Sequence, residues 1–190
     1  MMVNDAFLIY QAKSFYNAYI ALEQIKNEND PIMYLIPMLA NGAFSVELAL
    51  KAILTKQGIK YKNEHNLKVL FDKLPSNIQN DLWNYLVTKK PEYVDTQKRE
   101  TELIIMSDAF VKCRYCFEGD GAPAFDINFL SAFANAAIYT MFNLGYNTYI
   151  TPSVHTETDA EIEKKIEDNR NSFLQSSTKY IKSKKTGGKV

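Results

Sequence analysis

Residues 32–57 read IMYLIPMLANGAFSVELALKAILTKQ, and this stretch decides the fold. Apolar side chains recur in it at steps of three and four, namely Leu35, Leu39, Ala43, Val46, Leu50 and Leu54. The stretch is apolar over most of its circumference, which is typical of a helix surrounded by other helices. We expect Pro37 to fall in or near the first turn, because proline is tolerated there. The sequence therefore predicts a central bundle helix.

Within this stretch, Ile32 to Leu54 is the segment of the chain that most resembles a membrane span. It contains Pro37, Asn41, Glu47 and Lys51, so a buried core helix of a soluble protein explains it better. The N-terminus lacks the basic region and cleavage site of a secretory signal. We therefore expect a cytoplasmic protein with no membrane partner.

Helical patterns lie on both sides of this stretch, and no alternating strand pattern accompanies them. The expected helices cover about 4–27, 32–57, 67–74, 76–88, 96–118 and 125–146. Asn66 and Asp126 are predicted N-caps, and Ser76 with Gln79 forms a predicted capping box. The chain has only 7 glycines and 6 prolines, which fits long helices. The fold class is all-α: an up-and-down bundle of about five to six helices over residues 1–150.

Residues 151–190 form a predicted extension of different character. Thr158 and Glu161 form a capping box for one outlying amphipathic helix, and 179–190 is rich in lysine. A solvated, disordered end is one interpretation. The other is a tail that contacts RNA or a partner protein.

Charge and cysteine content exclude some classes of protein. The 22 basic and 22 acidic residues leave no net charge, so broad coating of nucleic acid is disfavoured, although a small phosphate site is compatible. Cys113 and Cys116 are expected to pack in a reducing compartment rather than form a redox pair. Two cysteines and two distant histidines cannot be assembled into a four-ligand zinc site, so neither a metal nor a cofactor is expected.

Three charged residues are candidates for a site. Glu47 and Lys51 stand four apart in the apolar helix, where they form either a simple ion pair or the border of a polar site. His65 precedes the Asn66 cap and is either a general acid–base or a residue that fixes its loop by bonding a carbonyl.

The expected helix 96–118 adds an arginine. On a helical wheel its apolar stripe, from Leu103 to Phe117, is bordered by Ser107, Arg114 and Glu118. Arg114 is suited either to hold phosphate in a bidentate fork or to pair with Glu118 at i,i+4.

These residues carry a resemblance to a known family. The motifs are Ser45-Val-Glu47-Leu-Ala-Leu-Lys51-Ala-Ile-Leu54, then Gly58, then His65-Asn66-Leu67-x-x-Leu70, then Asp108-Ala-Phe110-x-x-x-Arg114-Tyr115-x-x-Glu118. Together they resemble the HEPN domain, named for higher eukaryotes and prokaryotes nucleotide-binding. The resemblance implies an α-helical homodimer linked to RNA cleavage, toxin–antitoxin pairs, phage defence, and nucleotidyltransferase or antitoxin partners.

The chain departs from that family at one catalytic position. Active members cleave RNA with an Arg followed after four to six residues by a His, whereas Gly119, Asp120 and Gly121 follow Arg114 here. We therefore expect a protein that binds RNA, a nucleotide or a partner protein, and whose nuclease activity is absent. In this interpretation Arg114 positions phosphate, Tyr115 packs near it, and four residues form the polar wall: Glu47, Lys51, His65 and Asp108.

Two alternatives remain open. One is a metal-independent ribonuclease that uses Arg114 with His65 or Asp120 as its base. The other is a dimeric scaffold without catalysis, whose bundle surface holds another protein.

Overall fold

The computed structural model describes residues 5–28, 31–114 and 126–145. The chain divides into two units, Met1–Thr148 and Tyr149–Val190, and all described residues lie in the first. The predicted extension 151–190 lies outside the described residues, as do Tyr115, Cys116 and Glu118.

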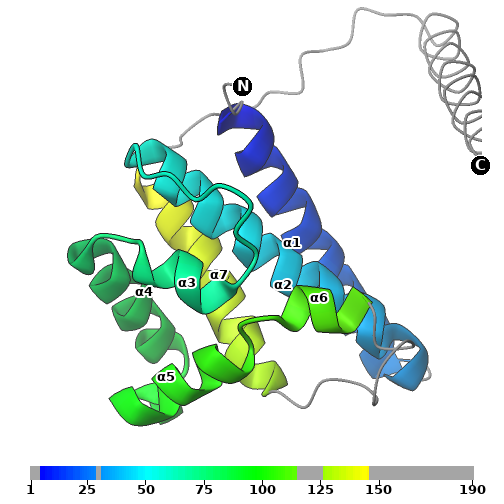
Figure 1. Cartoon of the computed structure of the whole chain (residues 1–190). Coiled ribbons are helices and arrows are strands. Elements are labelled where there is room, and N and C mark those ends of the chain that lie inside the picture. Colours follow the sequence, from blue (N-terminus) through cyan, green and yellow to red (C-terminus); the bar gives the residue numbers. More distant parts are fainter. Residues whose placement is uncertain (1–4, 29–30, 115–125, 146–190) are drawn as a thin grey trace, which may run out of the picture. The chain divides into compact units, whose positions relative to one another are not determined.

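The described part of the chain is all-α and contains no strand, which confirms the predicted fold class. Its elements are α1 (Asp5–Glu28), α2 (Pro31–Lys56), α3 (Leu67–Asp72), α4 (Ser76–Lys89), the 3₁₀ helix η1 (Pro91–Tyr93), α5 (Thr96–Ile105), α6 (Ala109–Arg114) and α7 (Ile127–Asn143). Figure 1 shows α1, α2 and α7 as the long helices of the bundle, with the shorter helices packed at their sides.

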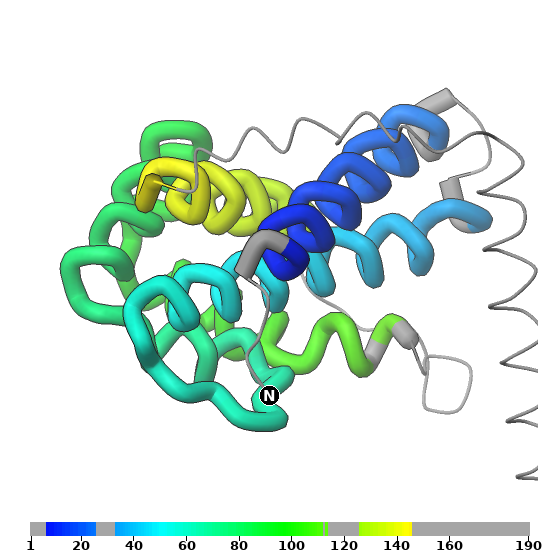
Figure 2. Tube along the Cα trace, turned by 90° about the horizontal axis from the view of Figure 1, so that it is seen from above, coloured from blue at the N-terminus to red at the C-terminus, as the bar shows by residue number. Residues whose placement is uncertain are grey.

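The predicted central position of α2 is confirmed. It contacts α1, α3, α6 and α7, and Figures 1 and 2 both show it alongside α1 in the opposite direction. Val46, Leu50 and Ile53 are completely buried. Over Met33–Lys56, α2 is also long and apolar enough to cross a membrane. However, 56% of its apolar 18-residue stretch is buried inside the protein, as in a core helix.

Gly42 lets three helices approach closely. A Cβ atom at this position would lie 3.0 Å from Tyr19 Cδ2 on α1 and 3.2 Å from Leu130 Cδ2 on α7. Any side chain here must push one of these neighbours aside, because cores are packed without spare volume.

Pro37 departs from expectation, since it lies inside α2 beyond the first turn. The helix begins at Pro31, one residue before the predicted start. Pro37 cannot donate to the carbonyl of Met33. Met33 is 70% exposed, so the lost helical hydrogen bond lies at an exposed residue and not in the core.

The predicted caps of α3 and α7 are confirmed. The Asn66 side chain accepts a hydrogen bond from the Val69 N–H, and the Asp126 side chain accepts from the N–H groups of Asn128 and Phe129. Gly58 ends α2 with φ +68°, a conformation that glycine adopts without steric cost.

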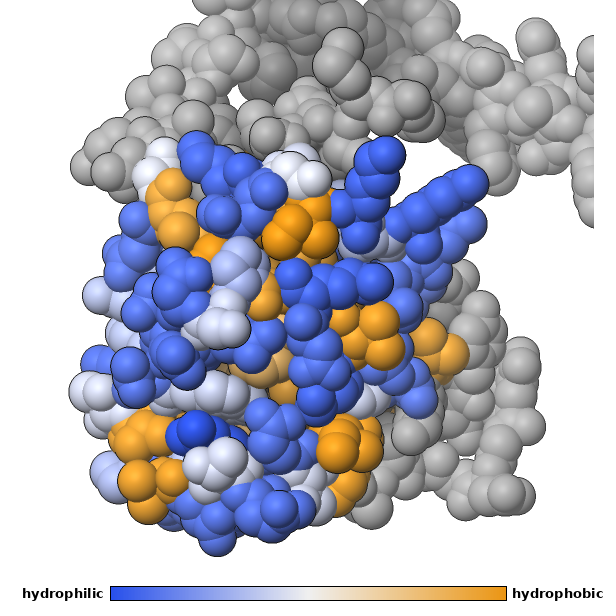
Figure 3. All heavy atoms as spheres, turned by 60° about the vertical axis from the view of Figure 1, so that its left-hand side comes forward, coloured by the Kyte–Doolittle hydropathy of each residue, from blue (hydrophilic) through white to orange (hydrophobic). Residues whose placement is uncertain are grey.

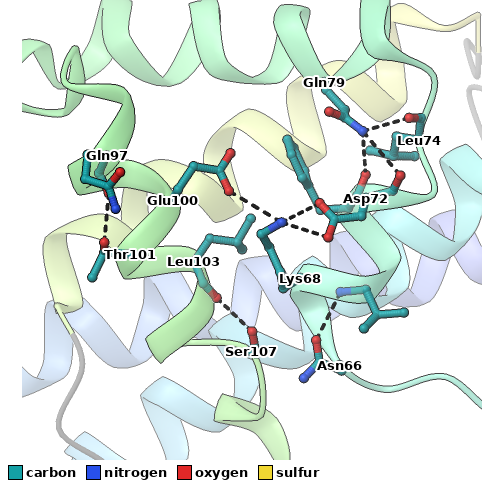
Figure 4. Close-up of polar contacts among 12 residues, drawn as sticks. Asn66, Lys68, Asp72, Leu74, Gln79, Gln97, Glu100, Thr101, Leu103 and Ser107 are labelled. Atoms are coloured by element: carbon teal, nitrogen blue, oxygen red, sulfur yellow. Dashed lines mark hydrogen bonds and ion pairs between the residues drawn. The ribbon is translucent and has the colours of Figure 1, made fainter.

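The predicted capping box of α4 is wrong. Ser76 makes no capping hydrogen bond, because Pro75 holds the cap position and its carbonyl accepts from the Ile78 and Gln79 N–H groups. The Gln79 side chain instead donates to the carbonyls of Leu74, at 2.8 Å, and Phe71, at 3.2 Å. Gln79 thus closes the tight connection between α3 and α4 (Figure 4).

The predicted helix 96–118 is also wrong, since the structure breaks it between Ile105 and Ala109. The Ser107 carbonyl leaves the helical pattern and accepts the Leu67 N–H at 2.8 Å, while the Ser107 hydroxyl donates to the Leu103 carbonyl (Figure 4). One helical wheel therefore does not describe the segment, and the placement of Ser107 and Arg114 on a shared border does not hold.

Candidate functional site

The site begins with a buried carboxylate on α2. The Glu47 side chain is only 2% exposed, and its Oε1 accepts from Lys51 Nζ at 2.7 Å. The same oxygen lies 2.9 Å from His65 Nδ1. The expected Glu47–Lys51 pair therefore exists, and His65 joins it. We call these three residues the Glu47 cluster.

Lys51 is held from several sides. Its side chain is 12% exposed, and its ammonium lies 5.7 Å from the centroid of the Tyr61 ring, within the range of a cation–π contact. The Tyr61 hydroxyl contacts Thr55 Oγ1 at 3.1 Å. Tyr61 thereby ties the connection between α2 and α3 to the last turns of α2.

His65 is the accessible member of the Glu47 cluster, with 57% of its side chain exposed. The Glu64 carboxylate accepts from the backbone N–H groups of His65 and Asn66 and fixes the backbone there. The imidazole contacts a carboxylate and not the carbonyl that one interpretation expected. Because Nδ1 makes this contact, Nε2 is the ring nitrogen left for a ligand.

Asp108 reaches the same neighbourhood through the cap of α3. Asn66 Nδ2 donates to Asp108 Oδ1 at 2.9 Å, and Asp108 lies in the turn between α5 and α6. The structure thus joins Glu47, Lys51 and His65 directly, whereas Asp108 is linked to them through Asn66, the residue that follows His65. The sequence indicated Asn66 as a cap and as part of the His65-Asn66-Leu67 motif, but its separation of 42 residues from Asp108 gave no signal of this hydrogen bond.

Arg114 is the last residue of α6 and lies six residues beyond Asp108. At 1.5 Å per residue, its backbone stands about 9 Å further along the helix axis. Its side chain is outside the described part of the protein, as are Tyr115 and Glu118. Their expected roles stay predictions.

The second oxygen of Glu47 is unusual. Oε2 is buried and has no hydrogen-bond partner among the described residues, whereas buried carboxylate oxygens normally accept hydrogen bonds. An unpaired buried acceptor costs about 1–3 kcal/mol. Among the described residues, Oε2 is therefore an acceptor that a further hydrogen-bond donor could use.

The two cysteines and the possibility of a metal site were also considered in the sequence. Cys113 is 2% exposed and packs among the core residues, as predicted, and Cys116 lies outside the described residues. Within the described ranges, no group of three or more His, Cys, Asp or Glu side chains is arranged to hold a metal ion.

Comparisons of the chain with protein families, with curated proteins and with solved structures find no match.

Proposed function

We propose that this chain is a HEPN-like helical protein that binds RNA, with the Glu47 cluster as its phosphate-binding site. One observation carries the proposal: a buried carboxylate holds an ammonium and an exposed imidazole on the same oxygen atom. The homodimer, the cytoplasmic location and the partner proteins implied by the resemblance belong to the same proposal.

The charges of the cluster favour an anion when His65 is protonated. Lys51 and protonated His65 then supply two positive charges against the single negative charge of Glu47. In this form the cluster carries a net positive charge and attracts a phosphodiester.

Single-stranded RNA and fluorescence anisotropy test the binding. Each neutralised phosphate of a single strand changes log K by about −0.7 per unit of log salt concentration. We expect His65→Ala to weaken RNA binding and to reduce the salt slope by about that amount. Asn77→Ala, an exposed position on α4, is the control and should change neither.

Two results would contradict the binding proposal. One is the absence of RNA binding at low salt. The other is a His65→Ala variant that binds with wild-type affinity and wild-type salt dependence at every pH.

A second function, RNA cleavage, is favoured by the contact between His65 Nδ1 and Glu47. A carboxylate on Nδ1 holds an imidazole in the tautomer whose Nε2 can accept a proton. Nε2 of His65 would take the proton of a ribose 2′-hydroxyl. The 2′-oxygen would then attack the phosphorus, and the 5′-oxygen would leave and take a proton from water, giving a 2′,3′-cyclic phosphate and a 5′-hydroxyl.

Product analysis tests the cleavage. We expect cyclic phosphate ends that disappear in His65→Ala and become rare in Glu47→Gln, which loses the carboxylate charge. Cleavage that persists unchanged in both His65→Ala and Arg114→Ala would exclude this function.

A further inference from the structure

A pocket of about 430 Å³ lies between α4 and α7. This volume is within the usual range of small-molecule sites, about 300–1,000 Å³. Its walls combine two aromatic rings, Tyr85 and Tyr139, with the polar side chains of Asp81, Asn84 and Asn143. It shares no residue with the Glu47 cluster. Figure 3 shows a largely hydrophilic face with separate hydrophobic patches on the side of the molecule where α4 lies.

The directions of the two helices explain which residues meet in the pocket. Tyr93, just after α4, donates to Asp126 at the start of α7, whereas Asp81 in α4 shares the pocket with Asn143 at the end of α7. The helices therefore run antiparallel. On α4, Asp81, Asn84 and Tyr85 are three and four residues apart and so lie on one face.

The two tyrosines form a stacking platform. Their ring centroids are 3.9 Å apart and the ring planes differ by 17°. Tyr85 is further held by a 3.4 Å hydrogen bond from its hydroxyl to Asn135 Oδ1. Tyr139 remains 44% exposed. Since Tyr85 covers one face of the Tyr139 ring, the other face is available to a planar ligand.

The polar groups beside this platform specify the ligand further. Asp81 offers only acceptors, while the amides of Asn84 and Asn143 offer both donors and acceptors. A planar ring with an amino group and ring nitrogens matches this set. Uracil matches less well, because its N3–H donor is flanked by two carbonyl oxygens, which would face the Asp81 carboxylate, and it has no amino group to donate.

We propose that this pocket binds a nucleobase that carries an exocyclic amino group, stacked on Tyr139 and donating to Asp81. The base can belong to a free nucleoside or to a single-stranded RNA. Lys89, whose ammonium lies 5.5 Å from the centroid of the Tyr85 ring, supplies a positive charge near the pocket for the phosphate of an RNA. Nucleosides have no phosphate, so their binding does not depend on the function proposed for the Glu47 cluster.

Calorimetric titration of the full chain with adenosine, cytidine, guanosine and uridine tests the pocket, and short RNA homopolymers form a second arm. Stacking of one base on an aromatic ring corresponds to about a 5- to 150-fold change in affinity. We expect a loss of this size in Tyr139→Ala, retention in Tyr139→Phe, and no change in Tyr10→Ala, which removes an exposed tyrosine from α1.

Asp81→Asn, on an exposed residue of α4, tests the donor preference even if Tyr139→Ala does not fold. It should weaken binding of the amino-bearing nucleosides and strengthen binding of uridine, whose carbonyl oxygens would then face an amide donor, whereas Glu92→Gln should alter the binding of none of them. If RNA binds but no nucleoside does, and Tyr139→Ala weakens the binding of RNA, the pocket takes a base of an RNA strand and not a free nucleoside. The proposal is overturned if neither nucleosides nor RNA respond to Tyr139→Ala and Asp81→Asn, or if uridine binds as tightly as the other three.

Discussion

Asp126 should contribute more to the free energy of unfolding than an ordinary helix cap does. Its Oδ1 accepts from the N–H groups of Asn128, at 2.8 Å, and Phe129, at 3.4 Å, while its Oδ2 accepts from the Tyr93 hydroxyl at 2.6 Å. Tyr93 is 1% exposed. Asp126→Ala therefore removes a cap and also leaves a buried hydroxyl without its acceptor.

The two losses can be given magnitudes. Loss of an N-cap costs about 1 kcal/mol, and a buried donor without its partner costs about 1–3 kcal/mol. We expect Asp126→Ala to lower the free energy of unfolding by about 2–4 kcal/mol, and Tm by about 4–16 °C at roughly 2–4 °C per kcal/mol. Asp95→Ala is a matched control, because Asp95 accepts from the Gln97 and Lys98 N–H groups at 2.8 and 3.4 Å. This variant should lose only about 1 kcal/mol.

Urea unfolding followed by circular dichroism measures these differences. In a cycle with Tyr93→Phe, the double variant should lose less than the sum of the single variants, with a coupling of about 1.5–3 kcal/mol for a hydrogen bond to a charged group. The reasoning is refuted if Asp126→Ala costs no more than Asp95→Ala, or if the effects of Asp126→Ala and Tyr93→Phe simply add.

The same pair predicts a pH dependence. Burial raises the pKa of Asp126, but the hydrogen bonds from Tyr93 and from the Asn128 and Phe129 N–H groups outweigh it and lower the pKa below its ordinary 3.8. The folded state thus gains stability above that pH and loses it as the pH falls through the lowered pKa. Burial, together with the bond to Asp126, raises the pKa of Tyr93. Its contribution is present below about pH 10 and is lost as the pH rises further. Asp126→Ala should flatten both limbs of the stability profile.

Further predictions concern packing and chain connections, and urea unfolding measures each. Leu50→Ala, at a fully buried position in α2, should cost about 2–5 kcal/mol, and a cost below 1 kcal/mol would contradict the central position of that helix. Gly42→Val should cost at least about 1–3 kcal/mol through overpacking, and an unchanged stability would show that the helices separate without cost. Gly58→Ala should cost about 1–2 kcal/mol, because alanine is strained at φ +68°. Asn66→Ala should cost more than Asp108→Ala, since only Asn66 also caps α3, and equal costs would argue against that cap.

The sequence predicts best what depends on near neighbours. The apolar spacing of 32–57 was sufficient to predict α2, and the caps at Asn66 and Asp126 follow from residues two or three positions away. Such patterns are local, so a single sequence contains them completely. The capping box at Ser76 was wrong because Pro75 already holds the cap position.

The break after Ile105 could not be predicted in this way. Nothing in the local pattern opposes a continuous helix. The helix breaks where the Ser107 carbonyl accepts a hydrogen bond from the Leu67 N–H group of α3. The contact between His65 and Glu47 likewise joins residues 18 apart. The sequence indicated that Glu47 was exceptional in an apolar helix. That Lys51 and His65 share its Oε1, and that no described residue donates to its Oε2, depends on how the chain folds back.

The hydrogen bond between the Leu67 N–H and the Ser107 carbonyl also couples the connection between α2 and α3 to α5 and α6. The Leu67 amide is protected only while the Ser107 carbonyl stays in place, and the Asn66–Asp108 bond joins segments 42 residues apart in the chain. Hydrogen exchange at Leu67 therefore reports the undocking of α5 and α6 rather than the fraying of α3. A ligand that engages His65 should slow that exchange, so one amide records occupancy of the Glu47 cluster.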